Sequence, residues 1–96
     1  MTEVPAVSHN AEGKQFELTT QVGPAILQYT SRDGLLEFLH TAVPKAVERR
    51  GYGTALVRAG LDHARASGVK VVPTCPFVRA FMDQHTEYAD VRATAA

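Results

Sequence analysis

Apolar and polar residues alternate in short runs through the first half of the chain, and this period of two predicts β-strands. Residues that favour tight turns separate the runs, in the stretches NAEGK, QVGP and SRDG. Short turns of this kind join antiparallel neighbours, so the strands should form a meander. The expected strands cover residues 6–9, 15–20, 25–30 and 35–43, and Pro44 ends the last of them.

The apolar period becomes helical between residues 51 and 67. Gly68 follows as a natural left-handed stop for this helix. A further strand is expected over residues 69–74, because the stretch VKVVPT is rich in β-branched residues. The apolar face of the helix is expected to comprise Leu56, Val57, Gly60, Leu61 and Ala64.

A second, shorter helix should begin at Cys75-Pro76, because proline is favoured at the first helical position. It is expected to end near residue 85, and residues 86–96 are expected to form a frayed tail. One face of this helix should carry Phe77, Phe81, Met82 and His85.

The resulting order is β-β-β-β-α-β-α. Residues 35–74 form a β-α-β unit, whose two strands should lie parallel with a right-handed crossover. The fold class is therefore α/β with a mixed sheet, in which an antiparallel meander joins one parallel strand.

Composition narrows the classes of function. The 96-residue chain balances 10 basic against 10 acidic residues, whereas nonspecific nucleic-acid binding depends on excess positive charge. No apolar run is long enough to span a membrane, and the opening MTEVPAVSHN lacks the order of a signal peptide. The single cysteine excludes an internal disulfide. We expect one cytoplasmic domain, residues 1–96, without nucleic-acid or membrane partners.

The stretch ERRGYGTAL, residues 48–56, is the first candidate for chemistry. It begins the longest expected helix, where unpaired N–H groups and the positive dipole end favour an anion. Its glycines allow a ligand to approach the backbone, and Arg49 and Arg50 carry charge that can pair with phosphate. The same residues also suit a tight turn with solvated arginines, so the stretch alone leaves both interpretations open.

A longer block carries a family resemblance. The stretch HTAVPKAVERRGYGTALVRAGLDHARASGVKVVPTCPFVRAFMDQHTEY, residues 40–88, resembles the small single-domain branch of the GNAT superfamily of acyl-CoA-dependent N-acetyltransferases. The VVPTCPFV block is its most specific part. The resemblance implies a notch for CoA between the strands at residues 35–43 and 69–74. It also implies direct transfer of an acetyl group from acetyl-CoA to an amine of a protein or small molecule.

The resemblance further implies where CoA would bind. Pantetheine would pair with the strand at residues 35–43, and pyrophosphate would lie on the loop and helix start. Glu48 departs from the superfamily pattern, which has Gln or Arg at this position, and a carboxylate there disfavours pyrophosphate unless it turns away. The implied cofactor-binding residues are Val43, Arg49, Arg50, Gly51, Tyr52, Gly53, Thr54 and Cys75.

Cys75 and His40 are the catalytic candidates. The positive end of a helix dipole lowers the pKa of a thiol at the helix start. Cys75 could therefore accept the acetyl group or donate a proton to the CoA thiolate. It could also only line the notch, or be a buried N-cap. Strict alternation places His40 on the apolar face with Phe38, either as a core residue or as the general base. Thr41 should point to the other face. The histidines lack metal-ligand spacing, so no metal is expected.

Two other functions stay open. Glu48 and the shortness of the chain also suit a module that binds CoA or acyl-CoA with little turnover. The third possibility is a structural domain that has lost its ligand. The sequence identifies neither the amine nor the oligomeric state, for which a monomer or weak dimer is expected.

Overall fold

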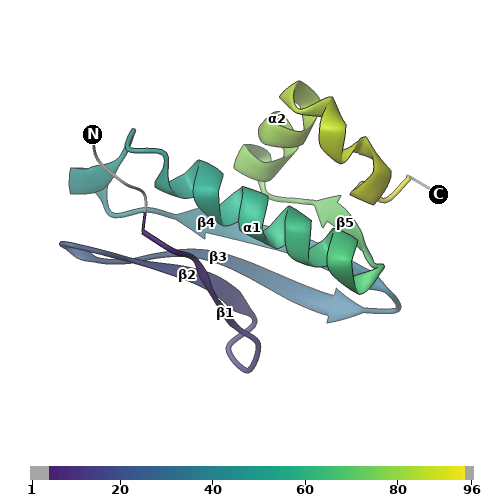
Figure 1. Cartoon of the computed structure of the whole chain (residues 1–96), viewed down its shortest axis with the longest axis horizontal. Helices are drawn as coiled ribbons and strands as arrows, with labels where there is room; N and C mark the ends of the chain where they lie inside the picture. The colour runs from purple at the N-terminus through teal and green to yellow at the C-terminus, as the bar shows by residue number, and fades with distance from the viewer. Residues whose placement is uncertain (1–4, 95–96) are drawn as a thin grey trace.

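The computed structural model describes residues 5–94 as a five-stranded sheet with two α-helices (Figure 1). The predicted order β-β-β-β-α-β-α is confirmed. Residues 1–4 and 95–96, which belong to the expected domain and its expected tail, lie outside the described part. The strands are β1 (Ser8–Asn10), β2 (Gln15–Thr20), β3 (Gly23–Arg32), β4 (Leu35–Ala42) and β5 (Lys70–Pro73), and the helices are α1 (Tyr52–Ser67) and α2 (Pro76–Gln84), with 3-10 helices η1 (Lys45–Val47) and η2 (Thr86–Val91).

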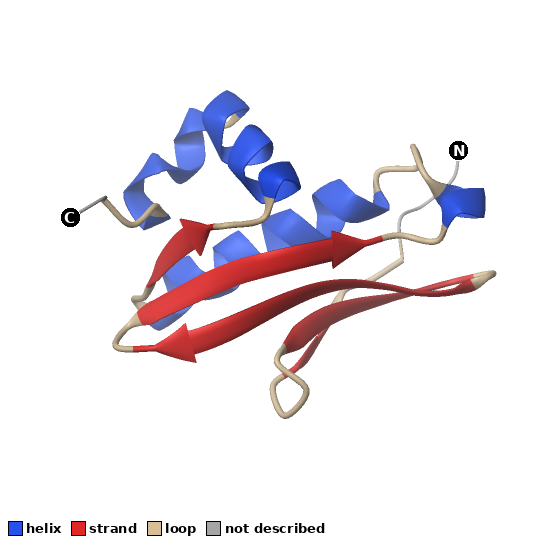
Figure 2. Cartoon of the chain, turned by 180° about the vertical axis from the view of Figure 1, so that it is seen from behind, coloured by secondary structure: helices blue, strands red, loops and turns tan. Residues whose placement is uncertain are grey.

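The sheet is mixed, as predicted. Its strands lie in the order β1-β2-β3-β4-β5; the first four are antiparallel, and β5 runs parallel to β4 (Figure 2). The parallel ladder is short, because it joins only Leu35–Phe38 of β4 to Lys70–Pro73 of β5. Residues 39–42 of β4 therefore extend past the end of β5.

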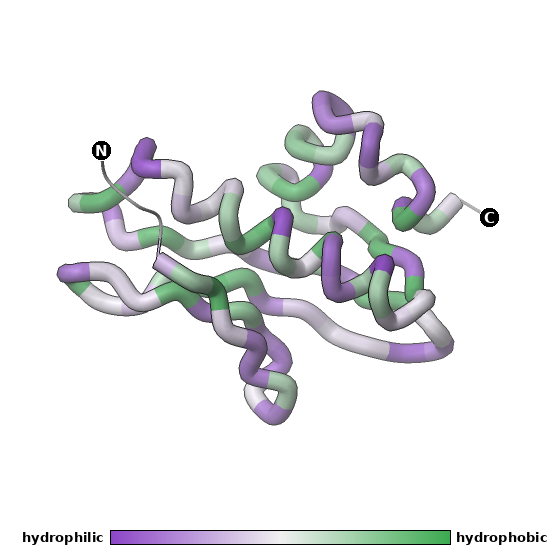
Figure 3. The backbone as a smooth tube through the Cα atoms, in the orientation of Figure 1, coloured by the Kyte–Doolittle hydropathy of each residue, from purple (hydrophilic) through white to green (hydrophobic). Residues whose placement is uncertain are grey.

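The helices lie on one side of the sheet, and no helix among residues 5–94 covers the opposite face (Figure 2). Hydrophilic and hydrophobic stretches alternate along α1 and α2, as expected for helices that bury one side (Figure 3). The predicted apolar face of α1 is confirmed as buried. Gly68 ends α1 in the left-handed conformation, with φ of 72°. Neither helix is both long and apolar enough to cross a lipid bilayer.

The apolar face of α2 differs from the prediction at its first turn. Val78, Phe81 and Met82 are buried and share the spacing of one helical face. His85 stacks on Phe81 as the predicted face requires. Phe77, in contrast, is 45% exposed. It lies one position away from the buried stripe and points toward the start of α1.

The C-terminal segment packs against the core, so the prediction of a frayed tail is wrong for residues 86–94. η2 buries Tyr88 and Val91. The Arg65 guanidinium of α1 donates to both carboxylate oxygens of Asp90, at 2.7 and 3.0 Å. A 3-10 helix buries few positions and has its own period of three, so its apolar residues give little signal in a sequence.

A bulge in β4 changes which of its side chains face the helices. Tyr29 of β3 pairs with Phe38, but the preceding residue, Gln28, pairs with His40. Leu39 is therefore an extra residue in β4. Because side chains alternate with a period of two, one extra residue reverses the alternation beyond it.

This reversal corrects the predicted faces of His40 and Thr41. Thr41 pairs with buried Leu27 and so lies on the face that the helices cover. His40 pairs with exposed Gln28 and is itself exposed. The expectations that His40 lies on the apolar face and that Thr41 points away from it are wrong, because strict alternation does not hold through the bulge.

Candidate functional site

The candidate site lies where β4 and β5 separate. Their last pair joins Phe38 to Pro73. Beyond it, the Cys75 N–H donates to the Phe38 carbonyl at 2.8 Å, and the chain turns into α2. Residues 39–42 continue with no partner from β5, and within this stretch the backbone of Thr41 hydrogen-bonds the Cys75 sulfur.

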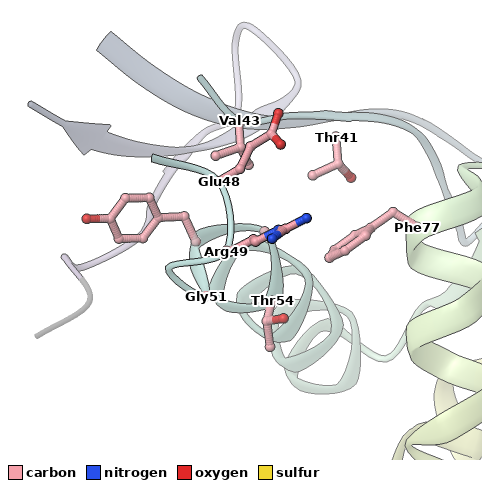
Figure 4. Close-up of a pocket in the computed structure, with 9 residues that line it drawn as sticks. Thr41, Val43, Glu48, Arg49, Gly51, Thr54 and Phe77 are labelled. Carbon is pink, nitrogen blue, oxygen red and sulfur yellow. The ribbon is translucent and has the colours of Figure 1, made fainter. Parts of the chain in front are cut away.

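A cavity of about 440 Å³ opens between the end of β4, the loop before α1 and the start of α2 (Figure 4). Its volume falls in the range of roughly 300–1,000 Å³ that is typical of ligand sites. Three separate segments contribute to it, so only the folded chain forms it. The lining residues are Thr41, Val43, Glu48, Arg49, Gly51, Tyr52, Gly53, Thr54 and Phe77.

The loop before α1 leaves backbone donors available. Buried Val47 anchors η1, and the chain then passes through Arg49 and Gly51, with φ of 68° and 83°. Glycine adopts this left-handed conformation readily, but in arginine it costs about 1–2 kcal/mol. No side chain caps α1, so the N–H groups of its first turn have no acceptor inside the helix.

Charges of both signs border the cavity. Figure 4 shows Arg49 extending toward Phe77, whereas the Glu48 carboxylate turns toward the end of β4. Among the described residues, neither Arg49 nor Arg50 forms an ion pair with a carboxylate. The Arg49 guanidinium therefore retains its capacity to bind an anion.

Phe77 forms the apolar wall on the α2 side. Its ring lies against Gly53, where an added β-carbon would come within 3.0 Å of Cζ and 3.2 Å of Cε2. The absence of a side chain at Gly53 lets the ring lie against the first turn of α1. Figure 4 shows the ring pointing into the cavity between Thr41 and Thr54.

Cys75 adjoins the cavity at the N-cap of α2. Its side chain is buried, and Sγ lies 3.5 Å from the Thr41 hydroxyl oxygen. Burial raises the pKa of the Cys75 thiol, but hydrogen bonds with Thr41 and with the backbone of Val78 and Phe77 lower it more. The net pKa lies below the ordinary value of a cysteine.

The cavity gathers most of the residues expected to bind the cofactor: Val43, Arg49, Gly51, Tyr52, Gly53 and Thr54. Cys75 adjoins it through Thr41. Arg50 is exposed and does not line it, and His40 lies on the opposite face of β4. Their roles in binding and catalysis stay predictions. Among residues 5–94, no three His, Cys, Asp or Glu side chains are grouped so as to hold a metal ion.

Two lining residues were missed as site residues by the sequence pattern. Strict alternation along β4 predicted that Thr41 points away from the helices, because the local sequence gives no sign of the bulge. Phe77 was expected on one face of α2 with Phe81 and Met82, but Val78, Phe81 and Met82 form the buried face without it. The spacing of Val78, Phe81 and Met82 could have indicated that Phe77 lies outside the buried face.

Comparison with known proteins supports the architecture. The sequence model of the family described as GCN5-related N-acetyl-transferase matches residues 15–91. The fold is similar to the NMR solution structure of a GCN5-like candidate N-acetyltransferase from Staphylococcus aureus, with a TM-score of 0.75 and 20% identity. That match covers 99% of this chain and 94% of the other. The chain belongs to the GCN5-related N-acetyltransferase family.

Proposed function

We propose that this protein transfers the acetyl group of acetyl-CoA directly to an amine. The observation that carries the proposal is the cavity at the start of α1, which adjoins the gap between β4 and β5. Acetyl-CoA supplies an acetyl group activated as a thioester. The residues around the cavity offer separate surfaces for the phosphates and for the pantetheine arm.

The start of α1 suits the pyrophosphate of CoA. The N–H groups of Tyr52, Gly53 and Thr54 lie at the positive end of the helix dipole and are not capped by a side chain. Arg49 adds a guanidinium that can bind phosphate oxygens in pairs. Glu48 opposes this attraction, and the turn of its carboxylate toward β4 limits that effect.

The end of β4 suits the pantetheine arm. Residues 39–42 offer strand backbone that β5 does not use, and an extended chain with amide groups can pair with such an edge. Val43 and Phe77 provide apolar surface on either side of the cavity. This arrangement would bring the thioester close to Thr41 and Cys75.

In the proposed reaction, His40 accepts a proton from the amine and Cys75 donates a proton to the departing sulfur. A C–N bond forms as the C–S bond breaks, and the electron pair of the C–S bond goes to sulfur. Solvent then restores both side chains. His40 lies on the exposed face of β4, so the amine would approach from the side opposite the cavity. A lowered thiol pKa favours proton donation to a more basic thiolate.

Calorimetric titration with CoA and acetyl-CoA tests binding, and release of free CoA thiol from acetyl-CoA with a panel of amines tests turnover. We expect wild type to bind and turn over. Removing the base in His40→Ala should lower kcat about 10²-fold or more, while CoA still binds. His63→Ala, a histidine of α1 that does not line the cavity, is the matched control. Absence of CoA binding by folded wild type would refute the proposal.

The same assay on Cys75→Ala distinguishes two roles for the thiol. A reduced rate without acetylated wild-type protein supports proton donation. An acetyl mass on intact wild-type protein that disappears in the variant would instead indicate transfer through Cys75. Unchanged turnover in Cys75→Ala would leave the thiol with a lining role only.

A module that binds CoA or acyl-CoA with little turnover is the alternative. Glu48 borders the proposed phosphate site, and among residues 5–94 no helix covers the face of the sheet that carries His40 (Figure 2). Binding without thiol release across the amine panel would favour this alternative. The identity of the amine, a cytoplasmic location and a monomer or weak dimer stay predictions.

A further inference from the structure

We propose that Thr41 is a positioning residue, whose hydroxyl orients the Cys75 thiol beside the cavity and donates a hydrogen bond to the sulfur as the proton leaves. The inference rests on the proposed function, in which Cys75 supplies that proton. It adds a residue that the sequence pattern placed on the wrong face of β4. Its evidence is the strand register and the contact between the two side chains.

Because of the bulge in β4, the Thr41 side chain lies on the same side of the sheet as Cys75. Pairing with buried Leu27 puts Thr41 on the side of the helices. Regular alternation through Leu39, without the bulge, would put His40 on that side instead. The bulge in β4 therefore places the Thr41 hydroxyl, and not the His40 imidazole, next to the Cys75 thiol.

Both partners are held in place. The Cys75 N–H donates to the Phe38 carbonyl at 2.8 Å, which fixes the start of α2 against β4. Thr41 is β-branched, so its hydroxyl has few rotamers. The Thr41 oxygen lies 3.5 Å from Sγ, within reach of a hydrogen bond to sulfur. Among the described residues, Thr41 is the one whose side chain hydrogen-bonds Sγ.

A hydroxyl suits both protonation states of the thiol. Its oxygen can accept the S–H hydrogen bond, and its hydrogen can be donated to the thiolate. Donation to the charged form is the stronger bond, so Thr41 favours loss of the proton. The backbone of Phe77 and Val78 acts in the same direction from the start of α2.

The elements next to this pair also carry ionisable residues. β4 carries Glu37 and His40, the loop before α1 carries Glu48 and Arg49, and α2 carries Arg79. Burial raises the pKa of Cys75, and hydrogen bonds that outweigh burial are the main reason that the net pKa is lowered. A substitution that removes only the hydroxyl therefore tests the proposal directly.

The test uses the single cysteine of the chain. The rate of alkylation by iodoacetamide is followed against pH without CoA or amine, in wild type, Thr41→Val and Thr41→Ser. We expect the midpoint of Thr41→Val to rise by about one pH unit, a tenfold loss of thiolate below the midpoint. Thr41→Ser should keep the wild-type midpoint. Thr30→Val, an exposed threonine of β3, controls for the change of residue type.

An unchanged or lowered midpoint in folded Thr41→Val would overturn the proposal. Circular dichroism and thermal unfolding establish that the variant is folded, and Thr41→Ser provides a second, milder variant. Because the alkylation needs no acetyl transfer, its result is independent of whether the proposed function holds.

The pH–rate profile then tests the role in transfer. With Cys75 as the acid, turnover should fall as the pH rises through the pKa of Cys75, which gives the pH–rate profile a falling limb. In Thr41→Val the falling limb should move to higher pH, in step with the alkylation midpoint, while KM for acetyl-CoA changes little. A shifted midpoint with an unmoved falling limb would overturn the role of Thr41 in transfer and leave acetyl transfer itself intact.

Discussion

Gly53 lies against the ring of Phe77, so that a β-carbon at residue 53 would approach the Phe77 Cζ atom to 3.0 Å. The two residues come from the starts of α1 and α2, and both line the cavity. Their contact sets the distance between two of the cavity walls.

Gly53→Ala should therefore weaken CoA binding more than it destabilises the fold. The new methyl group would push the Phe77 ring into the cavity, at a cost of about 1 kcal/mol, or about fivefold in Kd. Alanine favours the helix, which offsets part of the effect on stability. Calorimetry with CoA and thermal unfolding measure the two effects. Gly53→Ala combined with Phe77→Leu should recover part of the lost affinity, and equal Kd values for wild type and Gly53→Ala would contradict the prediction.

Arg49→Gly should stabilise the fold and weaken CoA binding. Relief of the left-handed conformation at φ of 68° should contribute about 1 kcal/mol to the free energy of unfolding. Loss of the guanidinium should raise Kd for CoA, with a weaker dependence on salt. Urea denaturation and calorimetry at two salt concentrations measure both.

Arg50→Gly is the matched control for this prediction. Arg50 has no positive φ and does not line the cavity, so its replacement should not raise the free energy of unfolding. A similar gain in both variants would show that the left-handed conformation of Arg49 stores no strain.

Glu48→Gln should tighten CoA binding a fewfold. Removing a carboxylate that borders the proposed pyrophosphate site is worth up to about 1 kcal/mol in an exposed setting, and the gain should shrink as salt rises. Glu12→Gln, in the exposed turn after β1, controls for the change in net charge. If the two variants bind CoA equally, the Glu48 side chain does not act on the ligand.

Acidification should weaken the contact between β1 and α1. The His9 and His63 rings lie 4.4 Å apart, and His9 Nε2 lies 2.5 Å from the Tyr29 hydroxyl. Burial lowers the pKa of His9, and the nearby His63 lowers it further. Because the folded pKa lies below the unfolded one, the contribution of neutral His9 is complete above about pH 6.5 and declines as pH falls toward the lowered pKa.

Urea denaturation at several pH values between about 8 and 5 should show this decline in wild type. His63→Gln removes the repelling charge and should flatten the profile. Identical pH dependence in both proteins would mean that the two rings do not repel one another when protonated.

Local sequence pattern determined the elements of this fold. Strand alternation located β2 at its observed bounds, the helical period located α1, and Gly68 located its end. The sequence pattern also located the loop at Arg49–Gly51 and the start of α1 that follows it. Periodicity and turn propensity act over a few neighbouring residues, so they can be read without knowledge of the partners.

Only the tertiary structure decided which side chains meet at the site. The bulge that turns Thr41 toward Cys75 follows from the pairing of β4 with β3. The ring of Phe77 lies against the start of α1, where Gly53 has no side chain to exclude it. Pairing and packing of this kind join residues far apart along the chain, and the pattern around any one of them does not encode its partner.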